Sequence, residues 1–155
     1  MQFKLVLLLV AVITMSNHVV RDKTDHKQSP LPIIGTWRLI SGTTITKKDT
    51  SVVDYTKNQK MIKIINKTHF AFLRHDLSQG KKADSAYESG AGTYTLSGNQ
   101  YTEYLEYCNY REWEGKKFQF TVTIKNDTLI QRGLEKVEEA GVNREIIERY
   151  VRVSK

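Results

Sequence analysis

A few polar side chains in the middle of the sequence are spaced so that they could bind one ligand together. Alternate side chains of an extended strand share a face, so Tyr101, Glu103 and Tyr107 are expected to point to the same side. That side is the more apolar one, which predicts that it faces the protein interior. A buried carboxylate needs a partner, and Arg74 is the expected counter-charge of Glu103.

Alternation on the neighbouring strands adds aromatic and amide side chains to this interior set. Gln131 is expected to face inward beside Val122. Such a cavity suits a small hydrophobic or amphipathic molecule, with Arg74 meeting any acidic group. The alternative is a satisfied polar network that fills a solid barrel. The predicted ligand-binding residues are Phe70, Phe72, Arg74, Tyr94, Tyr101, Glu103, Tyr107, Phe118, Phe120, Val122 and Gln131.

No residue spacing in the sequence indicates catalysis. Cys108 has no recognisable histidine partner, and a lone cysteine near a strand end is usually a small core residue. Glu103 and Glu106 are three positions apart on a strand, so they face opposite sides and cannot act as a carboxylate pair. No nucleophile elbow, phosphate-binding loop or zinc motif occurs. We predict a protein that is not an enzyme and has no cofactor, with an isomerase or hydrolase using Glu103 or a histidine as a remote alternative.

The histidines and the single cysteine do not predict a metal site. His69 and His75 lie on one predicted strand, roughly 20 Å apart at about 3.3 Å per residue, which is too far to share an ion. One cysteine excludes both an internal disulfide and a site built on paired cysteines.

Charge and length limit the class of partner. The 155 residues carry a formal net charge of +7, with the basic residues scattered along the chain. A nucleic-acid-binding protein would need a concentrated basic face with interleaved aromatic residues. We therefore expect no nucleic-acid partner, while the oligomeric state stays open.

The N-terminus predicts export. The apolar stretch 5–15 is shorter than the roughly 20 residues of a membrane-spanning helix and fits a signal peptide, assigned to residues 1–16. Residues 17–32 are polar and predict a flexible tether. No cysteine stands just after the apolar stretch, so a lipoprotein is not expected. We predict a periplasmic or secreted protein without stable membrane insertion, with a retained N-terminal anchor as the alternative.

From Gly35 onward the dominant pattern is the period of two that is typical of strands. Phe118, Phe120 and Val122 alternate with polar residues, giving the buried face and the wet face of a barrel wall. The pattern predicts one all-β domain over 33–155, an antiparallel eight-stranded up-and-down barrel of the lipocalin-like (calycin) type with little helix. Its strands are expected near 35–47, 60–66, 68–75, 91–97, 100–108, 117–126, 127–134 and 144–153.

Short turns fix the expected register of the strands. Gly98-Asn99, Asn126-Asp127 and Asn66-Lys67 each predict a two-residue hairpin. The residues 134–140 are expected to form one or two helical turns, and the loop 78–90 is expected to border the mouth of the barrel. The predicted pairs are Tyr94 with Glu103, Leu96 with Tyr101, Val122 with Gln131 and Ile124 with Leu129.

Several segments resemble one family. They are Gly35-Thr36-Trp37, the run 92–103 (GTYTLSGNQYTE), 118–122 (FQFTV), 126–133 (NDTLIQRG) and 148–152 (ERYVR). Together they resemble the exported bacterial lipocalin-like domains of unknown function, over about 33–155. The resemblance implies a meander barrel with no assigned activity. It also implies that Trp37 closes the barrel floor, with Arg152 packed over it, a contact worth about 0.5–2 kcal/mol.

The sequence departs from the classical lipocalins and from the fatty-acid-binding proteins. It lacks the lipocalin disulfide and C-terminal helix, and Tyr150 and Arg152 stand in the reverse order to the fatty-acid anchor, which is not carried over. We expect an exported barrel that binds a small molecule without transforming it. The alternative is a solid barrel that acts as a protein- or glycan-interaction module through the loop 78–90, Tyr110 and Trp113.

Overall fold

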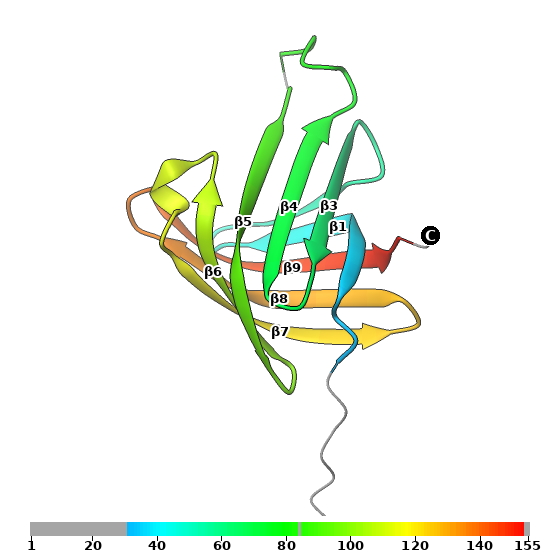
Figure 1. The fold of residues 1–155 in the computed structure, drawn as a ribbon. Helices are drawn as coiled ribbons and strands as arrows, with labels where there is room; N and C mark the ends of the chain where they lie inside the picture. Colours follow the sequence, from blue (N-terminus) through cyan, green and yellow to red (C-terminus); the bar gives the residue numbers. More distant parts are fainter. Residues whose placement is uncertain (1–30, 84, 154–155) are drawn as a thin grey trace, which may run out of the picture.

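The computed structural model describes residues 31–83 and 85–153 and shows an all-β protein with antiparallel strand pairing throughout. Apart from the second strand, which lies beside the first at the edge of the sheet, the strands follow one another around the sheet. Pairing of the first strand with the last closes it into a barrel (Figure 1). The strands are β1 (Gly35–Ile45), β2 (Thr50–Asp54), β3 (Gln59–Ile65), β4 (His69–Asp76), β5 (Tyr87–Ser97), β6 (Gln100–Cys108), β7 (Lys117–Lys125), β8 (Thr128–Val137) and β9 (Val142–Arg152).

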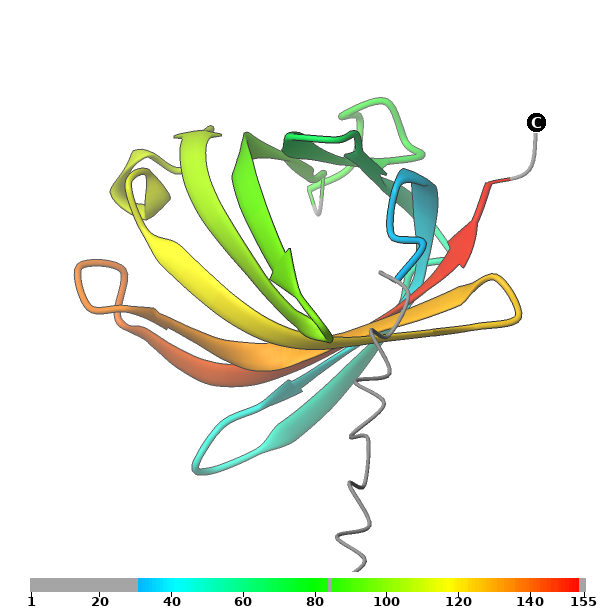
Figure 2. The same ribbon diagram turned by 60° about the horizontal axis from the view of Figure 1, so that its bottom comes forward.

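Eight of these strands form the predicted closed barrel, and β2 is an additional strand. The first half of β1 pairs with β3, whereas residues Ser41–Ile45 pair with β2 instead. The β1 part of the β1–β2 hairpin also pairs with β9, so it stays in the barrel wall; the hairpin is coloured cyan in Figure 2. All five residues of β2 are exposed, so the strand lacks the apolar alternation by which the others were predicted.

The hairpin registers that were predicted from two of the turns are confirmed. Tyr94 pairs with Glu103 across the Gly98-Asn99 turn, and Val122 pairs with Gln131 across the Asn126-Asp127 turn. Asn126 and Asp127 have φ of 48° and 57°, the left-handed conformation that a tight hairpin turn requires at both central positions.

The helical turns expected over 134–140 are wrong. β8 continues to Val137, which pairs with Val142 of β9 across a short turn. Gly141 is the positive-φ residue of this turn, at 65°. The described residues contain only one short 3₁₀ turn, η1 (Arg111–Trp113), and none of their helices is long and apolar enough to cross a membrane.

A bulge in β6 overturns the inward assignment of Tyr107. Leu105 pairs with Gly92 and Tyr107 with Ala91, so Glu106 is an extra residue without an opposite partner. One inserted residue reverses the alternation beyond it. Tyr107 is therefore 66% exposed. The close approach of the bulge is possible because Gly92 has no side chain, since a Cβ there would collide with the Tyr104 carbonyl.

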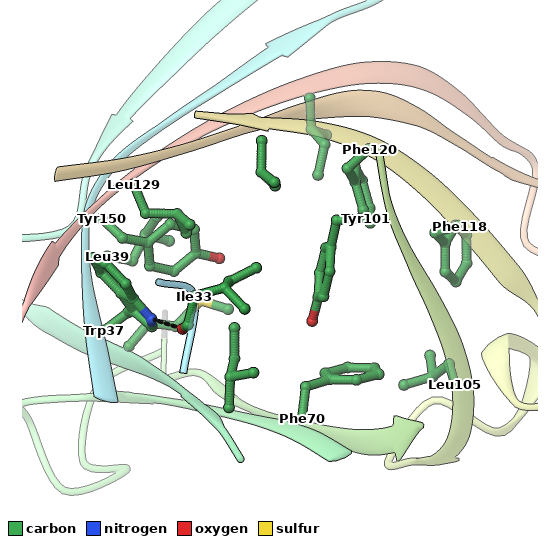
Figure 3. Packing of buried hydrophobic residues seen from close by; sticks show 14 of the residues in the cluster. Ile33, Trp37, Leu39, Phe70, Tyr101, Leu105, Phe118, Phe120, Leu129 and Tyr150 are labelled. Carbon is green, nitrogen blue, oxygen red and sulfur yellow. Dashed lines mark hydrogen bonds between the residues drawn. The ribbon is translucent and has the colours of Figure 1, made fainter. Parts of the chain in front are cut away.

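Part of the hydrophobic core fills one end of the barrel. It is built from residues at the start of β1 and β4 and the end of β3 and β9, which meet at the same end because the strands are antiparallel. Figure 3 shows Trp37, Leu39, Leu129 and Tyr150 together on one side, with Tyr101 pointing across the interior toward Phe70. We call this end the floor.

The Trp37–Arg152 contact implied by the resemblance lies at the floor. The Arg152 guanidinium carbon lies 4.0 Å from the centroid of the Trp37 ring. Arg152 also donates hydrogen bonds to the carbonyls of Ile34 and Pro32, and the Trp37 indole donates to the Ile33 carbonyl at 2.7 Å. The pair ties the segment before β1 to the end of β9. The predicted signal peptide, 1–16, lies outside the described residues, as does the tether apart from Leu31 and Pro32.

Candidate ligand-binding site

The end of the barrel opposite the floor contains a cavity of about 340 Å³. It lies between the end of β1 and the starts of β3, β5 and β9, with η1 at its rim. Its apolar walls come from alternate residues of the strands, and its polar groups from the same inward positions. The side chains that line it include Tyr55, Met61, Lys63, Phe72, Arg74, Glu88, Glu103, Leu105, Cys108, Tyr110, Trp113, Phe118, Phe120, Gln131, Glu135, Arg144, Ile146, Glu148 and Tyr150.

A buried lysine forms the bottom of the cavity, where it meets the floor. Lys63 Nζ donates to Glu103 Oε1 at 2.6 Å and to Gln131 Oε1 at 3.0 Å. The aromatic rings of Phe70, Tyr101 and Tyr150 have their centroids 5.6–5.8 Å from the same nitrogen. The counter-charge of Glu103 is therefore Lys63, from β3, and the assignment of this role to Arg74 is wrong.

Arg74 lies at the rim rather than at the bottom of the cavity. Its guanidinium donates to Glu88 Oε1 at 2.7 Å and to Gln59 Oε1 at 2.8 Å, and it stacks on Tyr55 at 5.4 Å. The register explains the difference, because Arg74 pairs with Glu88 near the open end of β4, whereas Glu103 lies nearer the floor.

A third ion pair borders the cavity beside η1. Arg144 Nε donates to Glu135 Oε2 at 2.7 Å, and the guanidinium lies 5.8 Å from the centroid of the Trp113 ring. Burial raises the pKa of Glu135, and Arg144 partly offsets this effect. Trp113 also packs on Phe118, so Trp113 forms part of the cavity wall. Tyr110, in contrast, is 45% exposed at the mouth of the cavity.

Glu148 is the remaining carboxylate of the cavity. It lies opposite Gly42 of β1 and Gln131 of β8, and it accepts a hydrogen bond from the Tyr150 hydroxyl at 2.7 Å. Burial raises the pKa of Glu148 to about 6, against opposing effects of Lys63 and the Tyr150 hydroxyl.

This raised pKa predicts how Glu148→Gln changes stability with pH. The pKa in the fold lies above the ordinary value of 4.5, so the folded state binds the proton more tightly than the unfolded state does. Ionisation therefore costs stability as pH rises through about 6, on the order of 2 kcal/mol in full. Glu148→Gln removes this cost, and its stability relative to the wild type should rise between pH 4.5 and pH 7.

Urea unfolding of both proteins from pH 4 to pH 8 measures the difference. Glu145→Gln is the matched control, because Glu145 lies on the same strand and its pKa is lowered by Arg132. The control should show no such gain with rising pH. A difference between Glu148→Gln and the wild type that does not change with pH would contradict the assignment.

The structure places the predicted ligand-binding residues in three groups. Tyr107 lies on the outer surface of the barrel, beyond the bulge in β6. Four line no part of the cavity and instead pack in or beside the floor, namely Phe70, Tyr94, Tyr101 and Val122. Of these, Tyr94 donates a hydrogen bond from its hydroxyl to the Asn66 carbonyl, and its ring centroid lies 5.2 Å from that of Tyr101. Six line the cavity, namely Phe72, Arg74, Glu103, Phe118, Phe120 and Gln131.

The sequence prediction missed most of the charged groups of the cavity. Lys63 stands two positions from the buried Met61 and Ile65, so the alternation of this strand could have identified it as an inward residue. Glu148 likewise lies between Ile146 and Tyr150 on the inward face of β9. The other charged residues of the cavity that the sequence prediction missed are Glu88, Glu135 and Arg144.

Histidine, cysteine and acidic side chains are the remaining groups that could bind a metal or act as a nucleophile. No group of three histidine, cysteine or acidic side chains that could hold a metal ion occurs within residues 31–83 and 85–153. Cys108 faces the cavity because of the bulge, and burial raises the pKa of its thiol. A raised thiol pKa lowers the fraction of the reactive thiolate.

No family model and no curated protein matches the sequence. Among solved structures, the chain is similar to an uncharacterized protein from Bacteroides eggerthii DSM 20697. The identity is 14% and the TM-score 0.44, and the match covers 77% of this chain and 98% of that chain. A likeness this low carries no argument about function.

Proposed function

We propose that this protein is an exported lipocalin-like barrel that binds a small amphipathic molecule without transforming it. The observation that carries the proposal is the half-filled interior. A solid floor closes one end of the barrel, and a cavity of about 340 Å³ lies above it. This volume falls at the small end of the range for ligand pockets, roughly 300–1,000 Å³.

The walls of the cavity match an amphipathic ligand. Met61, Phe72, Leu105 and Phe118 supply apolar contact area, while the ion pairs supply hydrogen-bonding groups at defined places. Ligand sites combine these two features, since apolar walls give affinity and a few polar groups fix orientation. Binding without a nucleophilic step is consistent with Cys108, the thiol of the lining, because burial raises its pKa and so lowers the fraction of the reactive thiolate.

Native mass spectrometry of the protein, expressed from the full sequence and purified from the periplasm of the expressing bacterium, tests the proposal. We expect an additional mass that disappears on denaturation. Thr44→Trp places a large side chain on an inward position of β1, opposite Ile146, and should reduce this bound mass. Thr123→Trp is the matched control, because Thr123 is exposed on the outer face of β7.

The proposal would be contradicted if only the polypeptide mass were seen after incubation with a lipid and metabolite extract of the host. It would also be contradicted if the two tryptophan variants lost the bound molecule equally. Recovery of the protein in the cytoplasm alone would contradict the exported part of the proposal.

A second candidate function is an interaction module that binds a protein or glycan through the outer surface. A row of apolar side chains on the outer face of β3, β4 and β6 favours it. Ile64 is 42% exposed and Leu73 40% exposed, and Tyr107 extends the row on β6. An empty barrel in the mass spectrum would favour this second function.

A further inference from the structure

The charges inside the cavity do not balance. Among the described residues its lining carries three cationic and four acidic side chains. Each cation is paired with one carboxylate, at 2.6 Å for Lys63–Glu103, 2.7 Å for Arg74–Glu88 and 2.7 Å for Arg144–Glu135. Glu148 is the carboxylate that remains without a cation at ion-pair distance within residues 31–83 and 85–153.

Glu148 is among the residues that line the cavity, so a bound molecule can approach its carboxylate from that side. The residue opposite it on β1 is Gly42, which has no side chain, and the ring of Tyr55 lies over that glycine. The Tyr150 hydroxyl occupies Oε2 of Glu148. Charged groups also reach Glu148 from other strands, since Lys63 of β3 attracts it and Glu103 of β6 and Glu135 of β8 repel it.

We propose that the ligand of this cavity carries one positive charge, as a protonated amine on an apolar or aromatic body, and places that charge against Glu148. This inference rests on the proposed function and names the class of its ligand. Glu148 is partly buried, and a carboxylate removed from water without a cation is costly. An ammonium group supplies both the missing charge and hydrogen-bond donors.

The cavity walls favour an organic cation over a metal ion. Hard metal cations take six or more oxygen ligands, and no group of three histidine, cysteine or acidic side chains that could hold a metal ion occurs among the described residues. The cavity lining also contains the aromatic and aliphatic side chains of Tyr55, Ile146 and Tyr150. Aromatic faces attract ammonium groups. Phe72, Phe118 and Leu105 then provide the apolar surface for the body of the ligand.

The proton is the natural competitor of such a ligand. Because burial raises the pKa of Glu148 to about 6, the carboxylate is ionised at pH 8 and largely protonated at pH 5. The preference for a cation should therefore weaken as pH falls through 6. Loss of the charge in Glu148→Gln should have the same effect at every pH.

Three probes that share an indole ring and differ in charge test the inference. They are tryptamine, which is cationic, tryptophol, which is neutral, and indole-3-acetate, which is anionic. Titration calorimetry at pH 8 with the wild type, Glu148→Gln and the control Glu145→Gln measures their affinities. We expect the wild type and the control to bind tryptamine about tenfold or more tightly than tryptophol, and indole-3-acetate most weakly.

Glu148→Gln should bind tryptamine and tryptophol with similar affinity, and the wild type should do so at pH 5. Equal binding of the three probes to the wild type at pH 8 would overturn the inference while leaving the proposed function intact. So would a tryptamine preference that survives in Glu148→Gln. Failure of all three probes to bind at millimolar concentration would also overturn it, and the bound mass in the native spectrum would then decide the proposed function separately.

Discussion

Lys63→Met is expected to lower the free energy of unfolding by about 3–5 kcal/mol, the cost typical of leaving one partner of a buried ion pair without the other. The lysine is buried, and its ammonium contacts both Glu103 and Gln131. Methionine fills a similar volume but has no charge and no donor. The Glu103 carboxylate would then remain inside the barrel with its charge uncompensated. Urea unfolding followed by far-UV circular dichroism measures the loss.

The double variant Lys63→Met/Glu103→Leu separates the charge effect from the packing effect. Removing both partners leaves an apolar interior, which is often close to neutral in stability. We expect the double variant to recover most of the loss. If it is less stable than Lys63→Met alone, the ion pair is not the source of the effect.

Trp37→Ala is the second variant for which we expect a loss of about 3–5 kcal/mol, as for other large-to-small changes of a buried aromatic residue. The indole is fully buried in the floor. Its removal opens a cavity, leaves the Ile33 carbonyl without its donor, and takes away the ring on which the Arg152 guanidinium lies. Far-UV circular dichroism is again the suitable probe, because the change removes one of the two tryptophans.

Trp113→Ala is the control, since it removes the other tryptophan from the half-buried rim of the cavity. It should cost clearly less stability than Trp37→Ala. Equal losses in the two variants would contradict the assignment of the closed end to the Trp37 side of the barrel.

The sequence was sufficient for the barrel because its local patterns determine local pairing. Two-residue turns fixed the registers of β5 with β6 and of β7 with β8, and the alternation of Phe118, Phe120 and Val122 identified a wall. Where the local pattern misled or was absent, prediction failed. The exposed β2 carries no alternation, and the bulge at Glu106 reverses an alternation that continues unbroken in the sequence.

The site was less predictable than the fold because its contacts cross the interior. The pairing of Lys63 with Glu103 joins β3 to β6, which are not neighbours in the sheet. Neither a turn nor a register places two such side chains in contact, since the contact depends on the depth of each residue in the barrel. Arg74 was on the correct face but too close to the mouth to reach Glu103.

The closure of the barrel by β1 and β9 also determines how the chain reaches this structure. Trp37 pairs with Arg152, so the closing contacts join residues near the two ends of the described chain. Pairing at this sequence separation gives a high contact order, for which folding times of milliseconds to seconds are typical. Until β9 pairs with β1, the sheet has free edges beside exposed apolar side chains, the state in which β proteins aggregate. The pairing of β1 with β9 that completes the barrel therefore also determines how long the newly made chain is exposed to aggregation.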